Sequence, residues 1–296
     1  MLNVYEQVER NKKRSLLVMV FFVVFVSLFV WLVGQIFQTS SNLIGLAITF
    51  SLFSSLGSYF WGDKMVLKLS GAKPANKETY FTFYTVAENL SIASQIPLPS
   101  LYVIESPALN AFATGRDPDH AVICATTGLL ESLDRTELEG VVAHEISHVV
   151  NYDIRLMTIV AILIGTITIL SDWIFRSSRG SGSRKKELNP VFAVIGILFL
   201  IITPIAAKLI QLAISRSREY LADVSAVKLT RQPRGLISAL KKLGQQPFSL
   251  RNAQSATAHL YIVNPFKGEH GFLKARALFS THPPLEARIK SLEKMI

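Results

Sequence analysis

The sequence predicts an α-helical membrane protein with a split α+β domain on one side of the bilayer. Two observations lead to this fold class. Long apolar segments come in two pairs, 15–61 and 156–214, and each pair is long enough to form a membrane hairpin. The polar regions after them, 62–155 and 215–296, contain short strand-like runs and helix-capping signals. Residues 1–14 form a separate N-terminal segment.

The first apolar segment runs from Ser15 to Phe37 and has no charge over 23 residues. At about 1.5 Å per residue, such a helix exceeds a hydrocarbon core of roughly 30 Å. Basic residues at 10–14 would also precede a signal peptide, but this segment is too long for one and no A-x-A site follows. Leu43 to Trp61 supplies a second span, whose serines are typical of packed membrane helices.

The second hairpin is predicted from Leu156 to Phe175 and Val191 to Ile214. The connector between these spans, Arg176 to Asn189, holds five Lys/Arg in a flexible Gly- and Ser-rich linker. Cytoplasmic loops carry an excess of cations, so the basic residues 10–14 place the N-terminal side in the cytoplasm. The five cations of the connector would then lie on the opposite side of the membrane, which conflicts with the same rule. Either the five cations are translocated, or the second hairpin only dips into the membrane.

The net charge of +10 raises the question of a nucleic-acid partner. The charge is uneven, because 61–153 has 6 Lys/Arg and 12 Asp/Glu whereas 215–296 has 14 and 5. Cations beside apolar spans indicate attraction to anionic lipid headgroups, so the lipid bilayer is expected as a partner and nucleic acid is not. A single Cys124 rules out a disulfide within the chain, which fits a reducing compartment.

The first polar region begins with short β-branched or aromatic runs at 101–105, 111–114 and 121–125. Pro and Gly turn residues separate these runs, which we expect to form antiparallel strands. Asp134 then caps a helix with the sequence TELEGVVAHEISHVV, and Glu137 completes a capping box.

That helix carries the motif His144-Glu145-Ile146-Ser147-His148. Residues four apart share a helix face, so both imidazoles can point at one ion, as the first two ligands of a catalytic zinc must. Glu145 lies on a neighbouring face, where it can act as the general base that takes a proton from a zinc-activated water. Apolar residues around the motif argue against a chance pattern on a solvated helix.

Catalytic zinc takes three protein ligands, so a third must come from elsewhere in the chain. The segment SREYLAD follows the fourth apolar span and places Glu219 and Asp223 four residues apart on one helix face. We expect Glu219 to be the third ligand of one Zn²⁺ per chain, and Asp223 to accept the other ring N–H of a ligand histidine. A surface ion pair of Glu219 with Arg216 or Arg218 is the alternative.

HEISH followed by SREYLAD resembles the gluzincin zinc proteases, and with its paired hairpins the chain resembles the HtpX heat-shock membrane proteases, relatives of the CAAX prenyl proteases. The similarity includes NAFA at 110–113 and STHPP at 280–284. It implies a zincin-like protease domain built from 62–155 and 215–296, on the cytoplasmic side of a bacterial inner membrane. It also implies cleavage of misfolded or damaged membrane proteins during stress, together with other membrane proteases as partners.

The resemblance also suggests roles for residues outside the motif. Asn110 and Ala111 would lie on an edge strand that receives the substrate backbone, a common way to hold an extended peptide, although Asn110 could equally be a turn residue. His282 would lie near the active site as a proton donor that stabilises the oxyanion, unless it belongs to a surface turn beside two prolines. Asp153 is expected to cap its helix or to pair with Arg155.

Two other classes of function are less well supported. A membrane zinc transporter would need histidine pairs and charges inside the spans, which hold only Asp172 and Lys208, both towards their ends. An inactive scaffold would have no need of Glu145, because a binding-only site uses no general base. The sequence therefore favours a membrane-bound zinc metalloendopeptidase.

Overall fold

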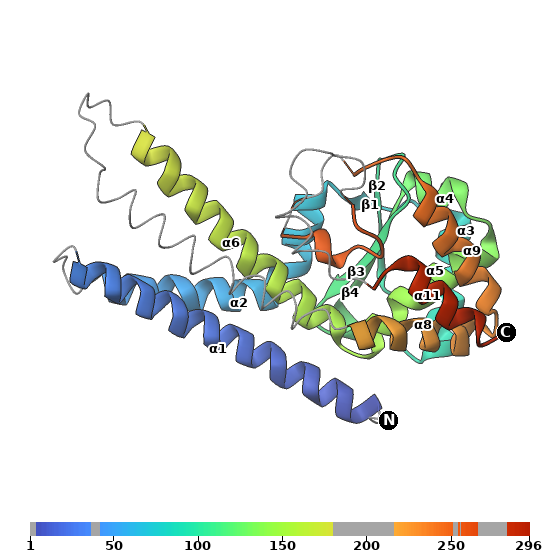
Figure 1. Ribbon diagram of the computed structural model, residues 1–296, viewed down its shortest axis with the longest axis horizontal. Helices are drawn as coiled ribbons and strands as arrows, with labels where there is room; N and C mark the ends of the chain where they lie inside the picture. Colours follow the sequence, from blue (N-terminus) through green and yellow to red (C-terminus); the bar gives the residue numbers. More distant parts are fainter. Residues whose placement is uncertain (1–3, 37–41, 180–215, 251–253, 255, 266–282) are drawn as a thin grey trace.

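Three long helices extend from a mixed α/β part in the computed structural model, which describes residues 4–36, 42–179, 216–250, 254, 256–265 and 283–296 (Figure 1). The long helices are α1 (Val4–Ile36), α2 (Asn42–Ser70) and α6 (Asp153–Arg179). They include the predicted spans Leu43–Trp61 and Leu156–Phe175, and the first span as far as Ile36.

The α/β part contains a four-stranded sheet of order β1-β2-β4-β3. Its strands are β1 (Lys73–Pro74), β2 (Ser100–Ile104), β3 (Ala111–Gly115) and β4 (Ala121–Thr126), so the three predicted strands are confirmed to within one residue at either end. The expectation that they are all antiparallel is wrong for one pair. β3 and β4 form an antiparallel hairpin through the short helix η1 (Pro118–His120), and β4 inserts between β3 and β2. After two reversals of the chain, β4 runs parallel to β2.

Helix α5 (Arg135–Val150) lies at the centre of the helical layer, against α3 (Phe81–Ser94), α8 (Arg216–Thr230) and α9 (Pro233–Gln245). The predicted capping box is confirmed, because Asp134 accepts from the Glu137 N–H and Glu137 accepts from the Asp134 N–H, both at 2.9 Å. Almost every residue of α5 after its first turn is buried. The HEISH motif therefore lies inside the domain.

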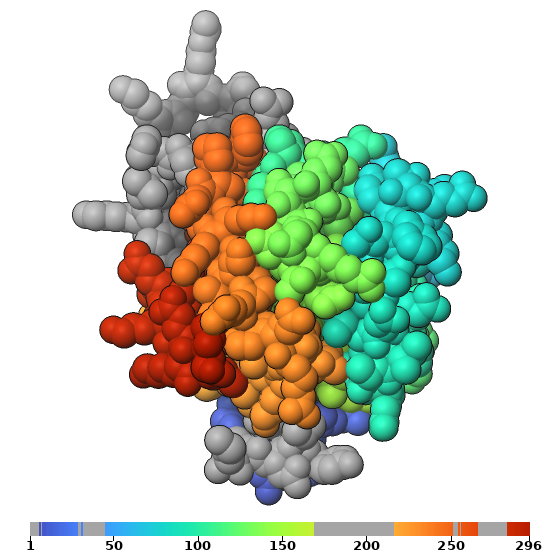
Figure 2. Space-filling view, turned by 90° about the vertical axis from the view of Figure 1, so that its right-hand side faces the viewer, coloured from blue at the N-terminus to red at the C-terminus, as the bar shows by residue number. Residues whose placement is uncertain are grey.

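The remaining helices complete the same domain from both polar regions of the chain. They are α4 (Thr127–Ser132), η2 (Ala258–Leu260) and α11 (Leu285–Glu293), with α11 packed against α8 and α9. Seen from the end opposite the long helices, segments that precede residues 180–215 lie beside segments that follow them (Figure 2). The domain is thus assembled from both sides of that stretch of the chain.

A sharp corner joins α5 to α6 and directs the chain out of the domain. The two helices meet at 84°, and Tyr152 between them has a φ of 58°. Beyond the corner, α6 packs against α1 through an apolar cluster of Val18, Phe22, Leu156, Ile159, Val160 and Leu163. The corner therefore connects the helix of the HEISH motif directly to the long-helix bundle.

Within the described residues, no helix taken singly has both the length and the apolar composition of a membrane crossing. The bent pair Arg135–Val150 and Asp153–Thr168 has both when taken together. The fourth predicted span, Val191 to Ile214, and the connector from residue 180 onwards lie outside the described residues.

Close contact between α5 and α9 at Gly140 gives a first test of this fold. A Cβ at Gly140 would lie 2.7 Å from the backbone nitrogen of Leu236, so α9 would have to move. We expect Gly140→Ala to reduce the free energy of unfolding by about 1–3 kcal/mol, measured as a lower midpoint of thermal unfolding. Gly57→Ala is the control, because a Cβ there meets nothing within 4 Å. Equal losses in both variants would contradict this packing.

Candidate metal centre

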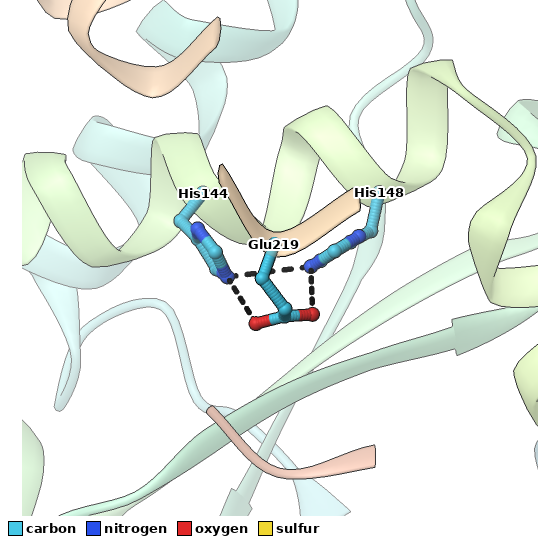
Figure 3. A group of neighbouring side chains, drawn as sticks. All are labelled: His144, His148 and Glu219. Carbon is cyan, nitrogen blue, oxygen red and sulfur yellow. Dashed lines mark hydrogen bonds and ion pairs between the residues drawn. The ribbon is translucent and has the colours of Figure 1, made fainter. Parts of the chain in front are cut away.

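The structure brings together His144 and His148 of α5 and Glu219 of α8, all buried (Figure 3). The two Nε2 atoms lie 3.3 Å apart, and the Glu219 carboxylate oxygens lie 3.8 Å from His144 Nε2 and 3.6 Å from His148 Nε2. In a tetrahedral zinc site, metal–ligand bonds of about 2.0–2.1 Å separate neighbouring ligand atoms by about 3.3–3.4 Å. The three side chains thus converge at the spacing that one small cation requires.

The types of donor in this cluster also suit zinc. Two imidazole nitrogens and one carboxylate oxygen form the donor set of many catalytic zinc sites, which leave a further position for water or substrate. Each histidine turns its Nδ1 away from the cluster and towards a buried carboxylate, so the Nε2 atoms remain to bind metal. The residues present fit a zinc ion.

The carboxylate beside His144 is Asp223, four residues after Glu219 on α8. Asp223 Oδ1 lies 3.0 Å from His144 Nδ1, and both side chains are buried. Glu219 and Asp223 therefore face α5 from successive turns of one helix, an arrangement that follows from their spacing.

The carboxylate beside His148 is Asp153, which the sequence analysis assigned differently. Asp153 Oδ2 lies 3.1 Å from His148 Nδ1. The expected partner, Arg155, instead donates a hydrogen bond from Nε to the carbonyl oxygen of Arg116. Of the two expected roles, the pairing with Arg155 is wrong, because the corner after α5 turns the start of α6 back towards the end of α5; Asp153 is the first residue of α6 and is not among the three clustered ligands.

Arg288 of α11 is a further residue of the centre that the sequence analysis missed. Its side chain is fully buried and donates to both oxygens of Asp223, at 2.9 and 2.6 Å. Its Nη1 lies 3.7 Å from Glu219 Oε2. Such a two-point bond fixes the plane of the Asp223 carboxylate. One signal was present: Arg288 occupies the apolar stripe of its helix together with Leu285, Ile289 and Leu292.

These contacts set the protonation of His144 and Asp223. Burial, reinforced by the charge of Arg288, lowers the pKa of His144 to about 4 against the opposing effect of Asp223. For Asp223, burial acts to raise the pKa, but the charge of Arg288 and hydrogen bonds from His144 and Arg288 lower it to about 2. At neutral pH, His144 is a neutral imidazole beside an ionised carboxylate, the form that binds metal.

His148 has the opposite tendency. Burial alone would lower its pKa, yet the hydrogen bond to Asp153 and the negative charges of Glu219, Asp153 and Glu145 together raise it to about 9. Glu145 is buried within the same helix and so contributes negative charge beside the two histidines.

The other residues suggested by the resemblance are placed as follows. β3 is an edge strand, and the Ala111 carbonyl accepts from the Ile262 N–H at 2.9 Å. Asn110 is buried, and its side chain donates to the Val263 carbonyl at 3.0 Å and accepts from the Val263 N–H at 3.3 Å. Residues 262–263 are thus already hydrogen-bonded to Asn110 and Ala111, where the edge strand β3 begins. His282 lies outside the described residues.

Comparison with known proteins identifies the family. Residues 82–296, more than half of the chain, match the family described as Peptidase family M48. The chain belongs to peptidase family M48. This M48 chain is a metalloprotease, and the similarity to the HtpX proteases is confirmed by its relatives.

Two relatives described as Protease HtpX homolog illustrate the match. The one from Dictyoglomus turgidum is 42% identical over 98% of this chain and 94% of its own length. The one from Thermoanaerobacter pseudethanolicus is 42% identical over 98% and 97%. Among solved structures, Ste24p of S. mikatae is 20% identical with a TM-score of 0.49, over 97% of this M48 chain and 66% of that one.

The raised pKa of His148 predicts how metal affinity of this M48 protein depends on pH. Because its pKa of about 9 exceeds the usual 6.5, the charged form stabilises the metal-free fold below pH 6.5, and this contribution is lost as the pH rises through 9. Zinc must displace that proton, so we expect affinity to rise about tenfold per pH unit between pH 7 and 9 and then to level off. Titration against a chelator of known pH dependence measures this.

Asp153→Asn is the matched control for the pH experiment. It removes the negative charge that favours charged His148, so its affinity should level off at a lower pH than in the wild type. A wild-type affinity that is flat from pH 7 to 9 would show that His148 is already neutral.

Proposed function

We propose that this protein is a membrane-embedded zinc endopeptidase that cleaves misfolded or damaged membrane proteins on the cytoplasmic side of the bacterial inner membrane. The observation that carries the proposal is the buried cluster of His144, His148 and Glu219, at zinc-ligand spacing, in a chain of the M48 family. The exposed apolar side chains of α1 and α2 support the location, and the position of the site beside the long helices supports the substrate class.

Exposed apolar side chains on α1 and α2 support a place in the membrane. On α1, Leu17 and Leu16 are 65% and 59% exposed, and on α2, Phe53 is 72% exposed. Others on the same helices are Val20, Phe21, Val24, Leu28, Leu46, Ile48, Phe50, Leu52 and Leu56. A soluble protein rarely exposes so much contiguous apolar surface to water, whereas a lipid bilayer would cover it at no cost.

In the proposed mechanism, His144, His148 and Glu219 hold the zinc, which when bound supplies a Lewis acid at the scissile peptide. Glu145 accepts the proton of the attacking water and passes it to the nitrogen of the leaving amine. Asp223 and Asp153 keep the two ligand imidazoles in the tautomer with Nε2 free for the metal. Arg288 holds the Asp223 carboxylate in the plane this requires.

The position of the site supports substrates delivered at the membrane. The helix of the HEISH motif leads through one corner into α6, and α6 packs against α1. The catalytic cluster therefore lies close to the end of the long helices that joins the domain. Peptide segments that emerge from a misfolded membrane protein would meet the domain there. Proteins unfolded in solution would lack that guidance and should be cut more slowly.

The two glutamates of the site should respond differently to the same substitution. Glu145→Gln removes the proposed base but no metal ligand, so it should lower cleavage of casein by about 10²–10⁴-fold with full zinc content. Glu219→Gln replaces an anionic ligand by a neutral one and should lose zinc first and activity as a consequence. Both are measured in purified full-length protein after dialysis against a weak chelator. Full zinc and full activity in Glu219→Gln would refute its role as a ligand.

The proposed orientation is tested with a reporter fused after Ile296. Four spans return residues 62–155 and 215–296 to the side of the N-terminus, so a reporter active only in the cytoplasm should be active and a periplasmic reporter silent. Cysteine labelling at Ser181 then distinguishes a translocated connector from a second hairpin that only dips into the membrane. A periplasmic signal after Ile296 would contradict the cytoplasmic domain.

A further inference from the structure

Asn11 of α1 makes a buried polar contact with the corner between α5 and α6. Its side chain is 4% exposed, and Nδ2 lies 2.8 Å from the Asn151 carbonyl oxygen and 2.8 Å from Asp153 Oδ1. Asn151 is the C-cap of α5, and Asp153 is the first residue of α6. One amide from the first long helix therefore bonds to both sides of the corner.

This contact continues to the metal centre through Asp153. The carboxylate turns Oδ2 to His148 Nδ1, at 3.1 Å, and Oδ1 to Asn11. Arg218 of α8 also approaches Oδ1, at 3.3 Å. A carboxylate held on one oxygen cannot rotate freely about its side chain, so the direction of the bond to His148 depends on these partners.

Two further features show that the corner needs support from outside. Tyr152 adopts a φ of 58°, a left-handed conformation that a bulky side chain rarely takes and that surrounding contacts must hold. Lys12, next to Asn11, lies with Nζ 4.4 Å from the centre of the Tyr152 ring, and Arg155 stacks on the same ring at 5.0 Å. Helix α1 thus contacts the corner through two neighbouring residues, Asn11 and Lys12.

The register of α1 is set by apolar packing that is independent of Asn11. Asn11, Ser15, Val18 and Phe22 are spaced by four, three and four residues, form one buried face, and lie along the helix that packs on α6. Val18 and Phe22 pack in the apolar cluster with α6. The first two residues of this face, Asn11 and Ser15, are polar. Among the described contacts, the Asn11 side chain bonds to another helix, whereas the Ser15 hydroxyl bonds within α1.

We propose that Asn11 is a positioning residue of the metal centre: its amide fixes the Asp153 carboxylate, and through it His148, so that zinc affinity depends on the Asn11 side chain. The inference rests on the proposed function for the metal itself. It predicts that loss of the Asn11 amide weakens zinc binding although Asn11 touches none of the three proposed ligands.

The test compares zinc affinity in full-length protein in detergent, by competition with a chelator. Asn11→Leu keeps the branched shape of the side chain but donates no hydrogen bond, and Asn11→Ala removes the amide without adding bulk. We expect either variant to bind zinc about three- to tenfold more weakly, less than the 10- to 100-fold typical for loss of a direct partner of a ligand. Asn11→Gln, which retains the amide, should recover part of the affinity.

Ser15→Ala is the matched control. Ser15 is equally buried on the same face of α1, but among the described residues its hydroxyl bonds only to the carbonyl of Asn11, so zinc affinity should stay at the wild-type value. A double-mutant cycle then tests whether the effect of Asn11 on zinc affinity passes through Asp153. With Asp153 already replaced by Ala, the Asn11 substitution should cause no further loss, because its effect passes through that carboxylate.

Each outcome decides one point. Wild-type zinc affinity in both folded Asn11 variants, or an Asn11 effect that is undiminished in Asp153→Ala, would overturn the positioning role. The same loss in Ser15→Ala would show that α1 packing in general is responsible, and would also overturn it. Wild-type protein that binds no zinc would instead refute the proposed function, and with it this inference. The unfolding midpoint of each metal-free variant identifies those that are folded.

Discussion

The structure depends on one constraint, the need to hold two histidine side chains inside a buried helix with both Nε2 atoms directed at one point. Asp223 and Asp153 meet this need by bonding to the two Nδ1 atoms, but each brings a negative charge into the interior. A buried carboxylate is costly unless it is paired and hydrogen-bonded. Arg288 satisfies Asp223, and Asn11 with Arg218 satisfies Asp153. The pairing of these charges therefore determines which distant segments must meet at α5.

That requirement explains the unusual order of the chain. The segments that supply Glu219, Asp223 and Arg288 follow residues 180–215, and Asn11 precedes the first apolar segment, while the HEISH helix lies between them. The metal centre therefore needs segments from before and after residues 180–215 to meet at α5. Folding of the domain and assembly of the long helices are thus coupled through the same few side chains.

The edge of the sheet is linked to the metal centre through Arg288. Ala111 begins the edge strand β3 and Asn110 precedes it, and residues 262–263 are hydrogen-bonded to both. Arg288 also donates to the Ile262 carbonyl at 3.3 Å. The same arginine therefore holds the metal-site carboxylate and the segment beside the strand edge, so the geometry of the two cannot vary independently.

The sequence by itself determined the features that depend on neighbours along the chain. The spacing of His144 and His148, the capping box of Asp134 and Glu137, the pairing of Glu219 with Asp223 on one face, and the apolar lengths are local periodicities of a helix. Only the tertiary structure decided the parallel pairing of β2 with β4, the bond of Asp153 to His148, and the roles of Arg288 and Asn11. The strand pairing joins residues 22 apart, the bond of Asp153 to His148 depends on a left-handed turn at Tyr152, and the contacts of Arg288 and Asn11 join residues 65 and 142 apart, which no local periodicity encodes.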